Sequence, residues 1–163
     1  GMLLSHLLTR AGVESVVVEM RSRTHVLSRI RAGILDAGSV ELMRGAGLGQ
    51  RTDREGLEHD GSWVVWGEGK SFLIDTQKFA GKPMMAYGQT AITEDLYRAA
   101  GERGAQVLDE TENVVPHDLA SDRPYVTFSR HGRTERIDCD YVAGCDGFHG
   151  VCRRAIPAEI QTV

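Results

Sequence analysis

Cysteine is scarce in this chain. Only three of its 163 residues are cysteines, Cys139, Cys145 and Cys152. Three is too few, and an odd number, for a disulfide framework, so we expect a reduced, cytoplasmic setting. The cysteines also lack the close pairing that zinc sites use, and the six histidines are scattered along the sequence. We therefore expect no metal site.

Long apolar runs and an excess of positive charge are also missing. The longest apolar runs extend over only a few residues, which argues against a membrane-spanning helix. The chain has 19 Lys+Arg and 23 Asp+Glu, a net charge of −4, so no positive field attracts nucleic acid or anionic lipid. With 41% hydrophobic and 26% charged residues, the composition is that of one globular domain.

The first twenty residues contain a helix followed by a strand. Apolar residues recur at helical spacing over Leu3–Ala11, and Gly12 supplies a left-handed residue that ends the helix. The β-branched run Val16–Val18 then predicts a short, buried strand of a parallel sheet, with Glu19 at its end. This order is the second half of a βαβ unit, and neither its first strand nor a glycine-rich loop precedes the helix.

The rest of the sequence predicts a mixture of helices and strands. The arginine-rich stretch Met20–Arg31 predicts a loop with a short helix, and Ile34–Met43 predicts a helix closed by Gly45 or Gly47. Another helix is expected from Thr90 or Thr93 to about Arg103. Strands are expected in the antiparallel region Leu57–Ile74, at Gln106–Leu108, Tyr125–Phe128 and Glu135–Ile137, the last two joined by a turn at His131-Gly132, and at the buried run Tyr141–Cys145.

Polar residues near predicted strand ends are the candidate ligand contacts. An acid at the position of Glu19 accepts hydrogen bonds from ribose hydroxyls in dinucleotide-binding folds, although a solvated acid is an equally good interpretation. Arg29 and Arg31, followed by the permissive Gly33, suit a phosphate contact; an arginine pair on a loop is more often simply solvated.

Two later segments have the same ambiguity. Asp146, after the predicted strand Tyr141–Cys145, suits a second ribose contact, with Phe148 and His149 facing the same crevice; the alternative is an aspartate that caps a helix. The amide of Gln89 suits a flavin or ribose edge, but also the start of a helix.

Taken in this order, the features resemble the amino-terminal part of the single-component flavoprotein aromatic hydroxylases. The resemblance covers essentially the whole chain. The strings Arg-Ile-Arg-Ala-Gly at residues 29–33 and Cys-Asp-Gly-Phe-His-Gly at residues 145–150 are more specific to members that hydroxylate 4-hydroxybenzoate than to the family in general. The resemblance implies an α/β fold, an FAD-binding, Rossmann-like (glutathione-reductase-like) parallel sheet with inserted antiparallel strands, incomplete at both ends. Residues 1–163 would form a partial FAD-binding domain, with the first substrate-domain strands inserted at about residues 57–85.

The resemblance also implies roles for individual residues. Glu19 corresponds to the acid that binds the ribose of the FAD adenosine, and Gln89 to another FAD contact. Asp146 lies in an Asp-Gly motif that serves both FAD and the nicotinamide cofactor, and Phe148 and His149 correspond to the face where NADPH docks. The implied FAD-contacting segment consists of Arg29, Ile30, Arg31, Ala32, Gly33 and Ile34, with Arg31 near the pyrophosphate.

The implied activity is that of an FAD-dependent oxidoreductase of aromatic catabolism. Such an enzyme uses NADPH or NADH, a choice that the sequence leaves open, and O₂ to convert 4-hydroxybenzoate to 3,4-dihydroxybenzoate. The full-length parent is expected to be a homodimer. No catalytic residue is identified in this chain, which we expect to be inactive alone. Two alternatives remain: a fragment of an NAD(P)-binding dehydrogenase or reductase, disfavoured by the antiparallel strands, and a non-catalytic nucleotide-binding module.

Overall fold

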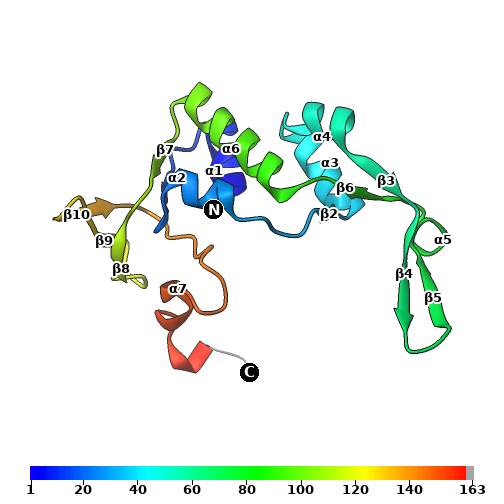
Figure 1. Ribbon diagram of the computed structural model, residues 1–163. Coiled ribbons are helices and arrows are strands. Elements are labelled where there is room, and N and C mark those ends of the chain that lie inside the picture. Colours follow the sequence, from blue (N-terminus) through cyan, green and yellow to red (C-terminus); the bar gives the residue numbers. More distant parts are fainter. Residues whose placement is uncertain (161–163) are drawn as a thin grey trace. The chain divides into compact units, whose positions relative to one another are not determined.

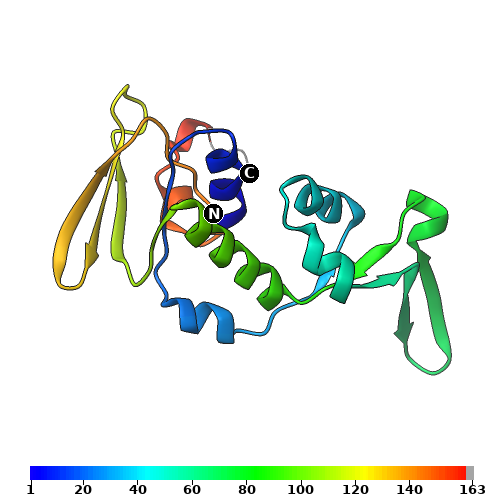
Figure 2. The ribbon, with the colours of Figure 1, turned by 90° about the horizontal axis from the view of Figure 1, so that it is seen from above.

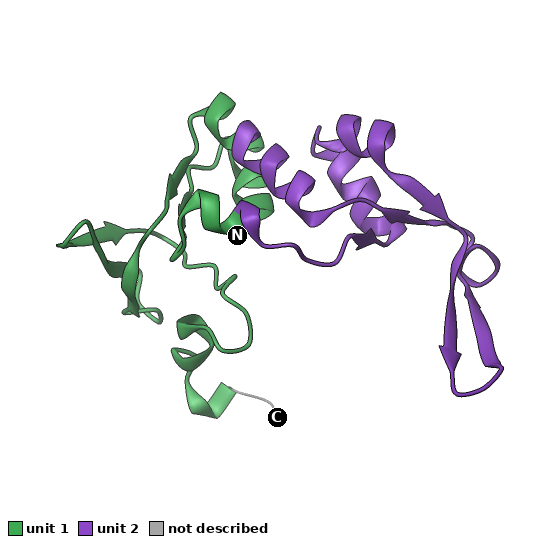
Figure 3. Cartoon of the chain, in the orientation of Figure 1, with its two compact units in different colours: residues 1–26, 100–163 green, residues 27–99 purple. Residues whose placement is uncertain are grey.

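The computed structural model describes residues 1–160 as two compact units (Figure 3). One unit comprises residues 1–26 and 100–163, and the other comprises residues 27–99. The last three residues of the predicted FAD-binding domain, 161–163, lie outside the described part.

The first unit contains the predicted helix–strand pair. Helix α1 (Met2–Arg10) ends where Gly12 adopts a φ of 77°, and the Val13 amide donates to the Leu8 carbonyl, which closes the helix as predicted. Strand β1 (Val16–Val18) follows and pairs in parallel with β7 (Gln106–Leu108). The parallel pairing confirms the interpretation of the β-branched run, although its side chains are half-buried and not fully enclosed.

A three-stranded antiparallel sheet completes the strands of this unit. Its order is β10 (Arg133–Asp138), β9 (Tyr125–Arg130) and β8 (Glu112–His117). The predicted turn between β9 and β10 is present, because His131 and Gly132 both have positive φ, 49° and 74°. Strand β8 was not predicted, since its pattern is interrupted by a register shift between Glu112 and Val115.

The predicted buried strand at Tyr141–Cys145 is wrong. These residues carry no strand, and Tyr141 is 92% exposed. A strand requires a hydrogen-bonded neighbour, and no strand among residues 1–160 pairs with this run. Further along are the short helix α7 (Val151–Arg154) and a 3₁₀ turn, η1 (Ala158–Ile160).

The second unit is built on a small antiparallel sheet, with β6 (Met84–Ala86) between β2 (Ile34–Leu35) and β3 (Leu57–His59). Helices α3 (Ala37–Gly45) and α4 (Gly49–Glu55) connect β2 to β3. The core of the unit is Val40, Met85 and Tyr87, with Leu35, Ala91 and Ile92 packed around it.

The prediction of one helix over Ile34–Met43 is only partly correct. Ile34 and Leu35 pair with β6 as strand β2, and the helix begins after Asp36, whose carboxylate accepts the Ser39 amide at 2.9 Å. Pairing with a distant strand and an aspartate cap together outweighed the helical spacing. The helix ends with Gly47 at a φ of 76°, one of the two predicted stops. The short helix α2 (Arg23–Ser28) agrees with the predicted loop and helix in Met20–Arg31.

The predicted antiparallel region forms a two-stranded hairpin. Strand β4 (Gly61–Trp66) pairs with β5 (Lys70–Asp75), and the short helix α5 (Thr76–Ala80) follows. Figures 1 and 2 show the hairpin extending away from helices α3 and α4 of its own unit. Its apolar side chains are consequently exposed on both faces, among them Trp63, Val65, Trp66 and Phe72.

The longest helix is α6 (Gln89–Arg103), with 15 residues. It begins before Thr90, so neither Thr90 nor Thr93 is its cap; the Thr93 hydroxyl instead donates to the Gln89 carbonyl at 2.8 Å. Gly104, with a φ of 70°, ends the helix. Within residues 1–160, no helix combines the length and the apolar character needed to cross a bilayer.

Candidate functional site

Glu19 lies at the end of β1 in the first unit, as predicted. Its amide donates to the Leu108 carbonyl at 2.9 Å and so extends the β1–β7 pairing by one residue. Its half-buried side chain accepts the Arg21 amide at 2.8 Å. One carboxylate oxygen thus shapes the turn after the strand, while carboxylates retain further lone pairs for a ligand hydroxyl.

Thr111 fixes the position of Glu19 and was not singled out from the sequence. The Thr111 amide and hydroxyl both donate to the Glu19 carbonyl, at 3.0 and 2.9 Å, and Thr111 is completely buried. A lone threonine after a predicted strand carries no signal of this role, because the two residues are 92 positions apart.

The arginine-containing segment lies in the second unit, between α2 and β2. Arg29, Arg31 and Ala32 are exposed and have no regular secondary structure, and Ile30 is 95% exposed. Within residues 1–160, neither Arg29 nor Arg31 forms an ion pair or hydrogen bond with another side chain. Two unpaired guanidinium groups, two residues apart in the sequence, suit a phosphate ligand.

Gly33 brings this segment against the chain that precedes α6. The Gly33 carbonyl accepts the Tyr87 amide at 2.6 Å, next to the β2–β6 pair of Ile34 with Ala86. A Cβ atom at Gly33 would lie 3.1 Å from the Gly88 Cα and 3.2 Å from the Tyr87 oxygen, tighter than ordinary van der Waals contacts. A side chain here would force one of the two backbones to shift by a few tenths of an ångström, so glycine suits this close approach.

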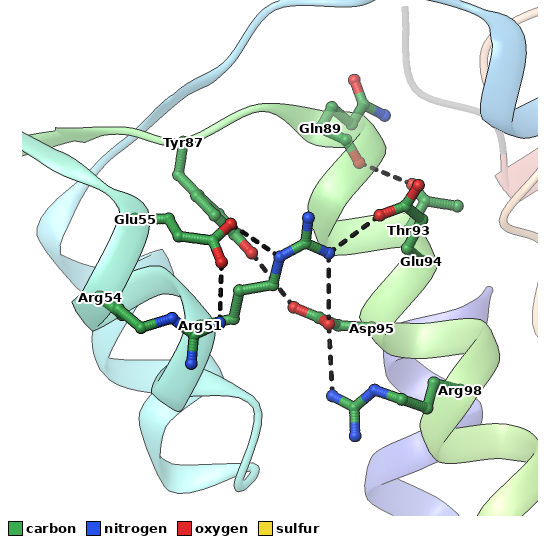
Figure 4. A network of polar contacts seen from close by, with 9 residues as sticks. All are labelled: Arg51, Arg54, Glu55, Tyr87, Gln89, Thr93, Glu94, Asp95 and Arg98. Atoms are coloured by element: carbon green, nitrogen blue, oxygen red, sulfur yellow. Dashed lines mark hydrogen bonds and ion pairs between the residues drawn. The ribbon is translucent and has the colours of Figure 1, made fainter.

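Gln89 follows directly and opens α6. Its side chain is exposed, and Figure 4 shows its amide pointing away from the Arg51 guanidinium. The structure thus places Gln89 beside the Gly33 turn, so two segments that the sequence singled out separately lie together in the second unit.

A polar network beneath these segments was not predicted (Figure 4). Arg51 of α4 donates to Glu55 at 2.8 Å and to Glu94 of α6 at 2.9 Å, and lies 3.7 Å from Asp95. Hydrogen bonds donated to the Glu94 and Glu55 carboxylates raise the pKa of Arg51 further above its usual value. The network links α4 to the first turns of α6, across 43 positions of sequence that no local motif reveals.

Tyr87 joins this network to the core. Its hydroxyl donates to Asp95 at 3.2 Å, and Arg98 lies 3.3 Å from the same carboxylate. Burial first, and then the nearby Asp95 charge, raise the pKa of Tyr87 to about 12. Tyr87 therefore stays protonated and remains a hydrogen-bond donor at neutral pH.

Asp146 of the first unit acts locally as a cap. Its carboxylate accepts the Cys152 amide at 2.9 Å at the start of α7, and this bond lowers the pKa of Asp146. A Cβ atom at Gly150 would lie 2.0 Å from the Asp146 Cγ, so the loop closes tightly around the carboxylate. The alternative interpretation as a helix cap is thus realised, and the ribose contact stays a prediction.

Phe148 and His149 extend from the same loop. Both are exposed, and their rings meet edge to face with centroids 5.1 Å apart. The Arg153 guanidinium stacks 4.1 Å from the Phe148 ring centroid. An exposed ring, a histidine and a guanidinium form a polar and aromatic surface beside Asp146.

Comparison with known proteins assigns the chain to a family. The family described as FAD binding domain matches residues 1–163, the whole sequence. The chain belongs to this FAD-binding domain family. Its cofactor is accordingly FAD, and the domain has a mixed α/β structure with parallel and antiparallel sheets.

Individual relatives are consistent with this assignment. The chain is 43% identical over 160 residues to p-hydroxybenzoate hydroxylase from Acinetobacter baylyi, which covers 98% of this chain and 39% of that protein. The structure of BexE, studied for oxidation during BE-7585A biosynthesis, superposes with a TM-score of 0.78 at 25% identity, covering 95% of this chain and 31% of BexE. The p-nitrophenol 4-monooxygenase PnpA from Pseudomonas putida has a similar fold, with a TM-score of 0.69 at 16% identity over 85% of this chain and 36% of PnpA. The chain thus spans about two fifths or less of the length of these proteins.

The residues present fit an FAD nucleotide. The backbones approach closely at Gly33, and the guanidinium groups of Arg29 and Arg31 in the same segment have no partner within residues 1–160. In the first unit, the Glu19 carboxylate is held at the end of a parallel strand, where ribose hydroxyls bind in dinucleotide folds.

Proposed function

We propose that this chain is part of an FAD-dependent monooxygenase that uses NADPH or NADH and O₂ to hydroxylate 4-hydroxybenzoate to 3,4-dihydroxybenzoate. The observation that carries the proposal is the 43% identity to p-hydroxybenzoate hydroxylase along 98% of the chain. Because the chain spans 39% of that relative, the activity is proposed for the whole protein, which we expect to be a homodimer, and not for these residues alone.

The proposed task of this chain is to hold the FAD nucleotide. Bound FAD would supply the redox chemistry between the nicotinamide and O₂. Glu19 accepts hydrogen bonds from the ribose hydroxyls, and the Arg29–Ile34 segment binds the pyrophosphate, chiefly through Arg31. The Gln89 amide forms a hydrogen bond with a flavin or ribose edge of FAD. In this proposal β1 and β7 belong to the parallel sheet of a Rossmann-like fold, and α1 is one of its helices.

The loop that carries Asp146 is proposed to face the nicotinamide cofactor. Phe148 offers an exposed ring for stacking, and His149 offers a polar ring beside it. Asp146 contributes by holding the loop, since its carboxylate already binds the Cys152 amide. Residues that bind or deprotonate the phenolic substrate are not assigned to this chain.

The activity is tested on the whole protein loaded with FAD. We expect 4-hydroxybenzoate to accelerate NADPH or NADH oxidation, with matching O₂ uptake and 3,4-dihydroxybenzoate as the product identified by chromatography. The p-nitrophenol named for PnpA is the comparison substrate, and it should not support product formation at a similar rate. A protein that binds FAD but shows no response to 4-hydroxybenzoate would contradict the proposed substrate.

A further inference from the structure

The two FAD-contact segments proposed in the second unit meet at one short stretch of backbone. The Tyr87 amide donates to the Gly33 carbonyl at 2.6 Å, and Gln89 lies two residues further on. The conformation at Tyr87 therefore sets both where the Gly33 turn lies and where the Gln89 side chain begins.

The Tyr87 side chain is held along its whole length. Its ring packs with Val40 and Met85 in the core of the unit, and Tyr87 is only 5% exposed. At the far end of the ring, the hydroxyl donates to Asp95 at 3.2 Å. The ring cannot shift without breaking this buried hydrogen bond or opening the core.

Asp95 is a buried carboxylate with two cationic neighbours. Its side chain is 5% exposed, and the guanidinium groups of Arg98 and Arg51 lie 3.3 and 3.7 Å away. A buried charge is tolerated only when it is paired and hydrogen-bonded, so Asp95 is fixed by hydrogen bonds from Tyr87 and Arg98 and by its ion pair with Arg51. Arg51 also binds Glu55 of α4, which ties the position of Asp95 to a second helix.

We propose that Asp95 and Tyr87 form a positioning pair, braced by Arg51, that sets the backbone of residues 87–89 against Gly33 and thereby orders the FAD contacts. This inference rests on the proposed function, which assigns Gly33 and Gln89 to the FAD site. Neither Asp95 nor Tyr87 touches the nucleotide; they act through the Tyr87 backbone. Their loss should therefore weaken FAD binding even where the unit stays folded.

The test is a double-mutant cycle on the purified whole protein, with the dissociation constant for FAD measured by flavin fluorescence. Tyr87→Phe keeps the ring and removes only the donor to Asp95, and we expect it to weaken FAD binding about fivefold, which corresponds to about 1 kcal/mol because the pair acts on the nucleotide only through the backbone. In the presence of Gln89→Ala, the same change should weaken binding only about twofold or less, because one contact that it positions is gone.

Two further variants separate positioning from folding. Arg51→Gln loosens the brace from its half-exposed side and should also weaken FAD binding, which provides a second route if Tyr87→Phe does not fold. Arg44→Gln is the matched control, since Arg44 pairs with Asp53 at 2.7 Å in the same unit but lies outside the network. The control removes an exposed ion pair and should leave the affinity for FAD unchanged.

The outcomes distinguish this inference from the proposed function. Unchanged affinity in both Tyr87→Phe and Arg51→Gln, or the same fivefold factor with and without Gln89→Ala, overturns the positioning pair while leaving the FAD site standing. Failure of the unsubstituted whole protein to bind FAD overturns both.

Discussion

Glu19 and Gly33, both singled out from sequence alone, are held through their backbone carbonyls. The Glu19 carbonyl accepts two hydrogen bonds from Thr111, and the Gly33 carbonyl accepts one from Tyr87. The candidate residues could be identified from the sequence because their types and spacing carry the ligand chemistry. The residues that hold them could not, since they are ordinary side chains brought in from distant positions.

Thr111 provides a prediction about the Glu19 anchor. Thr111→Val keeps the shape of this fully buried residue but removes the hydroxyl donor to the Glu19 carbonyl. We expect the free energy of unfolding to fall by about 1 kcal/mol, the usual net value of such a bond. Urea titration followed by circular dichroism measures the change. Thr111→Ser, which retains the hydroxyl, should keep the bond, and a larger loss in Ser than in Val would contradict this account.

Asp36 provides a prediction about pH. Hydrogen bonds from the Ser39 amide and hydroxyl lower the pKa of Asp36, so its charged form stabilises the folded state above the unfolded pKa of about 4. This stabilisation is lost as the pH falls through the lowered pKa. Asp36→Asn still caps the helix but does not titrate. Its unfolding free energy, measured by urea titration at several pH values, should be lower than that of the unsubstituted chain at neutral pH, and the difference should shrink in acid. A difference that stays the same at every pH would refute the role of the charge.

Helix ends were predicted better than helix starts. Gly12, Gly47 and Gly104 all have positive φ just beyond a helix, where glycine is the residue that tolerates that conformation. Starts depend on caps and on tertiary pairing: α3 begins at the Asp36 cap because Ile34 and Leu35 pair with β6. Two-residue and three-residue strands such as β2 and β6 have too few side chains to show an alternation.

Two glycines near the end of α6 provide a test with opposite signs. Gly101 is helical and exposed, and a Cβ atom there would meet nothing within 4 Å, so Gly101→Ala should stabilise the chain by about 0.5–1 kcal/mol. Gly104 has a φ of 70°, so Gly104→Ala should destabilise it by about 1 kcal/mol. Chemical denaturation of both variants measures the difference, and changes of the same sign would contradict the assigned helix end.

At the scale of the whole molecule, the hairpin β4–β5 presents an exposed apolar surface. Val65 is 70% exposed beside further large apolar side chains, and both strands present apolar faces. Exposed apolar strands promote association between copies. The alternation in this region predicted the strands correctly. It did not predict that their apolar side chains would be exposed, because burial depends on tertiary contacts that a local pattern does not encode.

Val65→Lys tests this surface. We expect less light scattering at equal protein concentration, with a change in unfolding free energy within about 0.5 kcal/mol because the side chain is exposed. Thr134→Lys is the matched control, since Thr134 is an exposed strand residue of β10, outside the hairpin, and the added charge is the same. Equal suppression of scattering by both variants would show that net charge, and not the apolar surface, governs association.

The site as a whole was only partly predictable. The order of Glu19, Arg29–Ile34, Gln89 and Asp146 pointed to a flavin nucleotide, and the family assignment supports that cofactor. The network of Arg51 and Asp95 was not predicted because its contacts between α4 and α6 join residues that are far apart in the sequence. Long-range ion pairs are properties of the folded chain, so only a structure reveals them.

The central claim, that the FAD nucleotide is held by Glu19, the Arg29–Ile34 segment and Gln89, is tested most directly by hydrogen exchange measured by mass spectrometry with and without FAD. The account predicts slower exchange of backbone amides at residues 19–21, 29–34 and 87–89 when FAD is bound, with the β4–β5 hairpin unchanged. FAD binding that protects other segments and leaves these three unaltered would contradict it.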